Sequence, residues 1–458
     1  MHNACGLQVL RRLAITLSIL FVFCLFGSDV QGQAIQGKFV IASWWDPDFT
    51  GIAAIDEMRL SLFRNAHFNT LTGLNARSSN GMLEEAPAHY PGVRYKLERI
   101  AKVGGLRLML LDWLFWTNMK SDISRTVGSV VAQYGGLPLS LANLVAGYNT
   151  WDEPQPGDQL ARAKSWILEF NKKDPRRIVW ANLAPYNQGT FPKWSNYVDY
   201  VRSYLADNST SVASFDYYPF LGNGKWRNYC HDPKDPPYYF RNLDLFAVET
   251  RVKGAIFWAF PLSSQHVDYS PISRVNLQFT AFAPIVNGAK GLVYYTYQWC
   301  REDATMRSSI VDTNGDTTEI YSWAKAINQQ VESLGPLLMS FAWQGTYHEN
   351  SSDTGYAGCS TEPGLSMLPS NHTFIRSFSS SNKSSMIGEF KTGSAPYLLV
   401  FNKDRSSSRD VTLTLKKSVP VWECNKITGL WTRKSAPTES ITIQAIQPAD
   451  VRVLRLAD

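Results

Sequence analysis

Several common functional motifs are missing from this chain of 458 residues. Its six cysteines lack the spacing of a metal site, so we expect no zinc centre. Lysine and arginine form no long run and the net charge is only +6, so nucleic acid is not an expected partner. No glycine-rich phosphate loop follows the first predicted strand, which argues against an open, doubly wound sheet. We therefore expect no cofactor.

Long apolar runs are also scarce, with one exception at the N-terminus. Residues 13–26 form an apolar run that follows two arginines and precedes small residues up to Gly32. This order is typical of a secretory signal, and the run of about 14 residues is short for a membrane span. We expect residues 1–32 to be a signal peptide, with an uncleaved anchor as the alternative. The mature protein would then be secreted or lumenal, without stable membrane insertion.

The remaining cysteines and the glycosylation motifs fit secretion. Removal of the signal would leave an even number of cysteines, which in a secreted chain suggests two disulfides. The four candidates are Cys230, Cys300, Cys359 and Cys424. If the first two bridge near the predicted active site, the last two would pair in the C-terminal region. The N-glycosylation candidates are Asn208, Asn350, Asn371 and Asn382.

Short apolar runs alternate with amphipathic stretches along the first two thirds of the chain. Eight runs read as buried parallel strands: 39–45, 69–75, 106–113, 144–151, 178–183, 212–218, 255–260 and 291–297. Four amphipathic stretches read as helices: 159–171, 238–252, 274–287 and 318–334. This alternation predicts an α/β fold, a (β/α)8 TIM barrel over residues 33–338.

The C-terminal region, residues 339–458, has a different pattern. Serine- and asparagine-rich turns separate short alternating strands, and helical signals are absent. The clearest predicted strands are 397–401, 411–415, 419–423, 441–443 and 451–456. We expect a small all-β domain, an antiparallel β-sandwich packed on the barrel.

The C-terminal ends of barrel strands carry the active site in this fold, and here they gather carboxylates, amides and aromatic rings. Aromatic rings stack on the C–H faces of sugars, and carboxylates and amides bond sugar hydroxyls, so we expect a carbohydrate substrate. The candidate binding residues are Trp44, Trp45, Asp46, Asn75, Asp112, Trp113, Asn182, Tyr217, Trp258 and Tyr295.

The fourth predicted strand ends at the most informative motif, Asp152 and Glu153 followed by a proline. Glu153 is the best candidate for a general acid, because a neighbouring tryptophan and proline can lower the local dielectric and raise its pKa. Adjacent residues of a strand point to opposite faces, so only a bend before Pro154 would bring Asp152 to the same site. Asp216 is the second catalytic candidate, whereas His266 reads as a loop histidine.

The layout resembles the (β/α)8 glycoside hydrolases of the large retaining clan, with an appended β-sandwich. The stretches that carry the resemblance are 151–154 (Trp-Asp-Glu-Pro), 215–219 (Phe-Asp-Tyr-Tyr-Pro), 288–297, 318–338, 397–403 and 446–456. The resemblance implies a secreted glycosidase that cleaves a β-linked glycan or glycoconjugate, with Glu153 as general acid/base.

Two departures from that clan bear on the mechanism. Asp152 stands where the clan has asparagine, and residues 258–261 (Trp-Ala-Phe-Pro) offer no nucleophilic glutamate at the end of the seventh strand. The adjacent Asp–Glu pair is similar to that of hexosaminidases in which the substrate's 2-acetamido group is the nucleophile. By that resemblance Asp152 would orient the acetamide and Glu153 would be the acid.

Other interpretations stay open. Glu153 and Asp216 can form a catalytic pair, whose separation of about 5 Å or roughly 6.5–9.5 Å would decide between retention and inversion. A catalytically inactive carbohydrate-binding protein on a glycosidase-like barrel is the alternative from another class. A polysaccharide lyase using Arg77, His266 and Tyr295 is the weakest interpretation.

Overall fold

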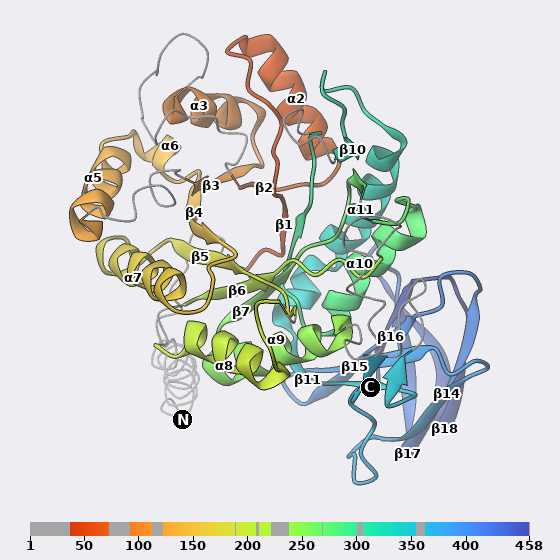
Figure 1. Cartoon of the computed structure of the whole chain (residues 1–458). Coiled ribbons are helices and arrows are strands. Elements are labelled where there is room, and N and C mark those ends of the chain that lie inside the picture. Colours follow the sequence, from red (N-terminus) through yellow and green to blue (C-terminus); the bar gives the residue numbers. More distant parts are fainter. Residues whose placement is uncertain are drawn as a thin grey trace, which may run out of the picture.

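Eight parallel strands close into a barrel at the centre of the molecule (Figure 1). The computed structural model describes residues 37–72, 92–111, 122–187, 189–207, 210–220, 238–267, 269–299, 306–353 and 362–457. The barrel strands are β1 (Val40–Ser43), β2 (Thr70–Leu71), β3 (Arg107–Leu111), β4 (Val145–Asp152), β5 (Ile178–Leu183), β6 (Val212–Phe215), β7 (Ile256–Ala259) and β9 (Gly291–Tyr294). They pair in this order, and β9 returns to β1. The predicted TIM barrel is confirmed.

Helices follow the strands and cover the barrel. They are α2 (Ala53–Asn65), α3 (Val93–Val103), α5 (Ile123–Gly135), α6 (Leu139–Ala142), α7 (Asp158–Lys173), α8 (Trp194–Leu205), α9 (Tyr239–Lys253), α10 (Arg274–Val286) and α11 (Glu319–Ser340). Helix α11 is longer than predicted from the sequence, because the buried Leu338 continues the apolar stripe of Leu334 beyond Pro336.

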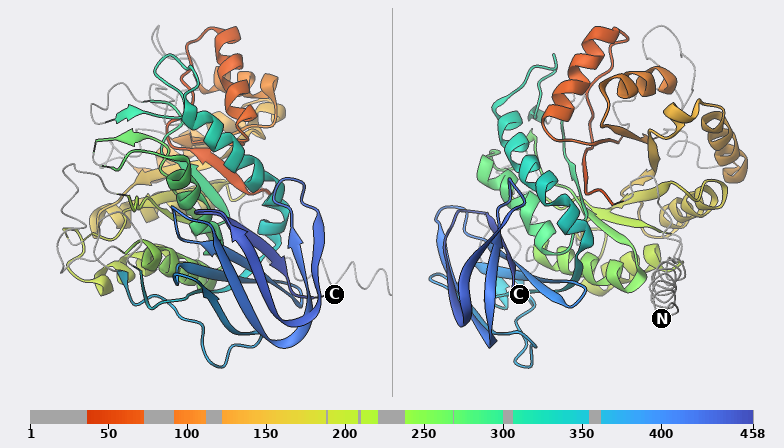
Figure 2. Two further views of the ribbon diagram at one scale, coloured as in Figure 1. Left: turned by 90° about the vertical axis from the view of Figure 1, so that its right-hand side faces the viewer. Right: turned by 180° about the vertical axis from the view of Figure 1, so that it is seen from behind.

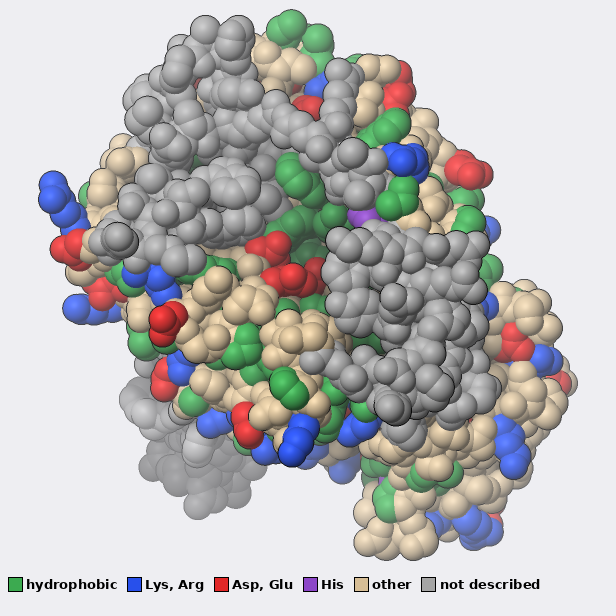
Figure 3. All heavy atoms as spheres, viewed as in Figure 1, with side chains coloured by type: hydrophobic (Ala, Val, Ile, Leu, Met, Phe, Trp, Pro, Cys, Tyr) green, Lys and Arg blue, Asp and Glu red, His purple; other side chains and the backbone are tan. Residues whose placement is uncertain are grey.

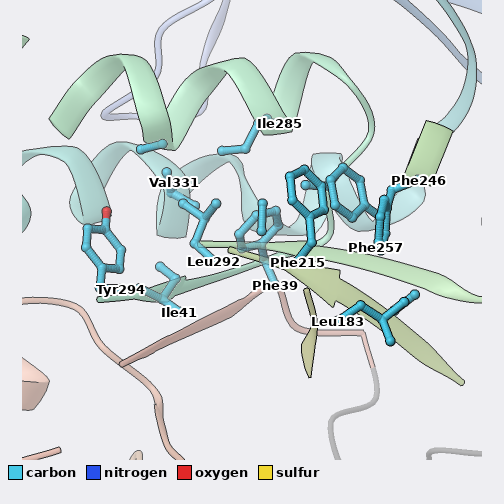
Figure 4. Packing of buried hydrophobic residues seen from close by; sticks show 14 of the residues in the cluster. Phe39, Ile41, Leu183, Phe215, Phe246, Phe257, Ile285, Leu292, Tyr294 and Val331 are labelled. Carbon is cyan, nitrogen blue, oxygen red and sulfur yellow. The ribbon is translucent and has the colours of Figure 1, made fainter. Parts of the chain in front are cut away.

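Alternation along the strands divides the apolar side chains between two cores. One set, including Ile41, Phe215 and Leu292, faces the helices and packs against residues such as Ile285 and Val331 (Figure 4). The other set fills the inside of the barrel. It includes Val40, Met109, Ala146, Trp180, Trp258 and Val293. Strands buried on both faces explain the near-continuous apolar runs of the sequence.

The C-terminal domain is an antiparallel sheet with its own apolar core, located at one side of the barrel (Figure 2). Its strands are β11 (Ala342–His348), β14 (Ile375–Ser380), β15 (Ser385–Thr392), β16 (Ala395–Asn402), β17 (Arg409–Cys424), β18 (Trp431–Ile446) and β19 (Val451–Arg455). The two strands expected at 411–415 and 419–423 are one continuous strand, β17. Register shifts against β18 let this long strand bend while Val411 and Val421 both stay in the core.

Short strands complete the two domains. β8 (Gln265–His266) pairs with β10 (Met306–Ser308), and β12 (Ser352–Asp353) pairs with β13 (Glu362–Pro363). Among the described residues, no helix is long and apolar enough to span a bilayer.

The two domains contact each other closely. Helix α10 packs against β15 and β16, and α9 packs against β11. The buried carboxylate of Glu362 accepts hydrogen bonds from the backbone N–H groups of Phe240 (3.1 Å) and Arg241 (2.7 Å), at the start of α9. Arg405 of the C-terminal domain lies over the ring of Phe220, in the segment that follows β6. The C-terminal domain therefore reaches a loop at the C-terminal ends of the barrel strands.

The modification candidates are only partly covered by the described residues. Asn371 and Asn382 are exposed and Asn350 is half-buried, all in the C-terminal domain, whereas Asn208 lies outside the described residues. Cys424 is buried. Cys230, Cys300 and Cys359 also lie outside the described residues, so the disulfides stay predictions.

Candidate active site

A pocket of about 300 Å³ lies at the C-terminal ends of the barrel strands. It is lined by Trp44, Trp45, Asp152, Glu153, Asp216, Tyr218, Phe260, His266, Tyr269 and Tyr295. The space-filling view shows acidic side chains gathered beside hydrophobic ones near the middle of this face (Figure 3). The pocket thus combines aromatic walls with three carboxyl groups, all three of them predicted from the sequence.

The end of β4 has the bend that the sequence requires for both acids to reach one site. In the pairing with β5, Asn149 lies opposite Trp180 and Trp151 lies opposite Ala181, so one residue of β4 is bulged out. Glu153 then adopts a left-handed backbone conformation with φ of 45°. That conformation costs about 1–2 kcal/mol for a residue other than glycine. Bulges and such strain are common beside active sites, where they redirect side chains.

A single amide holds two of the carboxyl groups in place. The Nδ2 group of Asn182 donates to Oδ1 of Asp152 (3.1 Å) and to Oδ1 of Asp216 (3.0 Å). The Oγ of Ser214 donates to Oδ1 of Asn182 (2.9 Å), which fixes the orientation of the amide. The backbone N–H of Glu153 also donates to the carbonyl of Asn182 (2.8 Å). Asn182, a predicted binding residue, thus organises the acids.

The side chains of Glu153 and Asp216 hydrogen-bond each other directly. Two carboxyl groups in such contact share a proton, because two negative charges so close repel strongly. A sugar bound between the two groups would have to break this hydrogen bond.

Burial and mutual repulsion raise the pKa of all three carboxyl groups. Burial is the main cause that raises the pKa of Asp152 to about 7, and the charge of Glu153 also contributes. The hydrogen bond from Asn182 acts in the opposite direction. Burial raises the pKa of Glu153, and the hydrogen bond with Asp216 opposes this. Burial and the charges of Glu153 and Asp152 raise the pKa of Asp216 well above its ordinary value. The cluster therefore retains protons near neutral pH and can donate one.

The other predicted binding residues are distributed more widely. Trp44, Trp45 and Tyr295 line the pocket. Trp258 lies instead inside the barrel, edge-on to Trp180 at 5.2 Å between ring centroids, and it is not among the lining residues.

Polar binding candidates also occupy several places. Asp46 is buried and its Oδ1 accepts from the backbone N–H of Thr72 (3.1 Å), away from the pocket lining. The hydroxyl of Tyr217 accepts from the backbone N–H of Tyr238 (3.2 Å), so this side chain turns toward α9. Three further candidates, Asn75, Asp112 and Trp113, lie outside the described residues.

Sequence reasoning missed Tyr218, Phe260 and Tyr269, and it discounted His266, although all four line the pocket. A signal for Tyr218 was present: side chains two apart in extended chain share a face, so Tyr218 was the better companion of Asp216 than Tyr217. The same spacing relates Phe260 to Trp258. No such rule identifies Tyr269 and His266, whose approach depends on the loop after β7.

Comparisons with known proteins establish the architecture. No family model matches the sequence, and no curated protein matches it. A β-galactosidase from Bacillus circulans sp. alkalophilus has a similar structure, with a TM-score of 0.58 and 9% identity, covering 92% of this chain and 99% of that one. A catalytic mutant of a GH42 β-galactosidase from G. stearothermophilus has a TM-score of 0.56 and 10% identity, covering 94% and 100%. The chain therefore has the fold of these glycosidases, a (β/α)8 barrel with an appended β domain.

Proposed function

We propose that this protein is a glycoside hydrolase that cleaves a β-linked glycan or glycoconjugate, with Glu153 as general acid/base. The observation that carries the proposal is the cluster of three carboxyl groups in an aromatic pocket at the C-terminal end of the barrel, where burial raises their pKa values. Cleavage of an acetal needs a proton for the leaving oxygen, and a carboxyl group of raised pKa can hold that proton at neutral pH.

The positions of the carboxyl groups favour a substrate-assisted mechanism, in which the 2-acetamido group of the substrate is the nucleophile. Strand β7 ends at Ala259 and is followed by Phe260, so this strand gives no carboxylate nucleophile. Asp216 is hydrogen-bonded to the acid itself, and it would have to release Glu153 before it could reach a sugar carbon. Asp152 is free of that contact and is oriented by Asn182. We infer that Asp152 accepts a hydrogen bond from the N–H of a 2-acetamido group.

The steps follow from these roles. Glu153 gives its proton to the glycosidic oxygen while the bond from the anomeric carbon to that oxygen breaks. The carbonyl oxygen of the acetamido group forms a bond to the anomeric carbon from the opposite side. In the second half, the Glu153 carboxylate takes a proton from a water molecule that attacks the same carbon and releases the acetamide oxygen.

The test compares wild type with Glu153→Gln on a panel of nitrophenyl glycosides that includes 2-acetamido sugars. We expect the variant to fold and to lose hydrolysis, and retention of more than about a tenth of kcat would sink the assignment. Glu439→Gln, which makes the same change at an exposed position of the C-terminal domain, is the matched control and should keep full activity. Cleavage of plain hexosides would mean that a protein carboxylate is the second catalytic group, and Asp216 would replace Asp152 as its candidate.

A carbohydrate-binding protein without catalysis is the second candidate. The lack of a carboxylate at the end of β7 favours it, since the usual displacement mechanism needs one there. The same panel separates the two functions: a wild-type protein that cleaves nothing but binds on a glycan array is a lectin.

We also propose that the protein is secreted after removal of residues 1–32. Support comes from the charged and apolar order of the leader and from the exposed sequons at Asn371 and Asn382. N-terminal sequencing of the protein from culture medium, with and without glycosidase treatment, tests cleavage and glycosylation together.

A further inference from the structure

The hydroxyl of Tyr218 is a polar group in the pocket that lacks a hydrogen-bond partner. Tyr218 follows β6, lines the pocket and is 9% exposed. Its hydroxyl oxygen is buried and bonds no other described residue. A buried hydroxyl without a partner is unfavourable, and native structures generally pair such groups with protein, water or ligand.

The surroundings of Tyr218 fix its ring and keep its proton. The ring lies edge-on to Tyr269 at 5.3 Å and tilted against Tyr295 at 5.5 Å, both of which also line the pocket. Burial, then the charge of Asp216, raise the pKa of Tyr218 well above its ordinary value. The hydroxyl is therefore a donor at every physiological pH, in a pocket that also holds three carboxyl groups.

We propose that the Tyr218 hydroxyl donates a hydrogen bond to an oxygen of the bound sugar, which makes Tyr218 a specificity-determining residue of the pocket. This inference rests on the proposed function, since it takes the ligand to be a sugar. The ligand group must accept a hydrogen bond from Tyr218. A sugar hydroxyl and an acetamido group both meet this requirement, and the experiment separates them.

The test is Tyr218→Phe, measured as kcat, KM and thermal midpoint on the glycoside that wild type cleaves fastest. Loss of one neutral hydrogen bond should raise KM roughly tenfold. The kcat stays unchanged if the acceptor is a sugar hydroxyl that takes no part in the reaction, and it changes as well if the acceptor is the acetamide oxygen, which attacks the anomeric carbon. In titration calorimetry, affinity falls for the 2-acetamido sugar alone if the acceptor is the acetamide oxygen, and for both the 2-acetamido and the 2-hydroxy sugar if it is another hydroxyl. Because the variant removes an unsatisfied group, its thermal midpoint should be unchanged or higher.

Tyr297→Phe is the matched control. Tyr297 is also buried with an unpartnered hydroxyl, but it packs against Phe63 and Phe68 and does not line the pocket. We expect its kinetics to equal those of wild type. An unchanged KM for Tyr218→Phe on every cleaved substrate, or a fall in thermal midpoint as the main effect, would overturn the proposal.

Binding measurements keep this inference separate from the proposed function. Titration calorimetry compares the Glu153→Gln protein with the Glu153→Gln, Tyr218→Phe double variant, using methyl glycosides of the same two sugars. We expect the double variant to bind roughly tenfold more weakly. If wild type cleaves nothing, the hydrolase fails and Tyr218 is judged by this comparison alone. Equal behaviour of the two proteins, including no binding by either, refutes the role of Tyr218.

Discussion

Replacement of Asp152 by asparagine should stabilise the protein at alkaline pH while it damages the site. The pKa of Asp152 is raised from its ordinary 3.8 to about 7 in the folded protein. A carboxyl group with a raised folded pKa costs no stability below about pH 4. The cost grows as the pH rises from about 4 to about 7, the unfolded and folded values, and stays constant above that. The asparagine never ionises, so the variant escapes that cost.

The magnitude follows from the same two values. A shift of about three pKa units corresponds to about 4 kcal/mol, at 1.36 kcal/mol per unit. Asp152 keeps part of its surface open to the pocket, so water screens part of this cost. We therefore expect Asp152→Asn to gain about 2–4 kcal/mol at pH 8 and close to nothing at pH 4. The Oδ1 of the new amide can still accept from Asn182.

The assay is urea unfolding of wild type and variant at pH 4 and pH 8, followed by tryptophan fluorescence, beside hydrolysis of a 2-acetamido glycoside. Asp199→Asn removes an exposed carboxyl from α8 and is the control, whose small effect should be the same at both pH values. A gain in stability of equal size at pH 4 and pH 8 would refute the electrostatic reasoning, as would a loss at pH 8. Full activity of Asp152→Asn would contradict its role toward the acetamide.

Two further predictions concern the C-terminal domain. A Cβ at Gly388 would lie 2.1 Å from the carbonyl oxygen of Val286, so Gly388→Ala should force α10 away from β15 and cost about 3 kcal/mol or more. Gly135 has open space around it, so the control Gly135→Ala should not destabilise the protein. Equal thermal midpoints for the two variants would contradict this prediction. Burial alone would raise the pKa of Asp404, but hydrogen bonds from two serines and Arg409 lower it to about 2. The Asp404 carboxylate therefore stabilises the folded protein above about pH 4, and this contribution is lost as the pH falls through 2. Asp404→Asn should cost about 1–2 kcal/mol of unfolding free energy at pH 7, measured by urea unfolding. A variant as stable as wild type would disprove the argument.

The barrel was predictable because its strands are buried on both faces. Burial on both faces produces continuous apolar runs. Seven of the eight runs in the sequence contain one of the barrel strands, and the run 144–151 covers all of β4 except its last residue, Asp152. The strand ends then follow, which is why Asp152, Glu153 and Asp216 were identified before any coordinates. The separation of β17 into two predicted strands failed, because a bend with register shifts resembles a turn in sequence.

The sequence by itself thus determined the fold and the order of acids along the strand ends, since apolar periodicity reports burial. Only the tertiary structure decided how those acids meet. The left-handed backbone conformation of Glu153 brings its side chain and that of Asp152 to the same pocket. The side chain of Asn182 in β5 then joins Asp152 to Asp216, which directly follows β6. These features depend on contacts between distant strands and on the low dielectric of a closed barrel, and both exist only after the chain has folded.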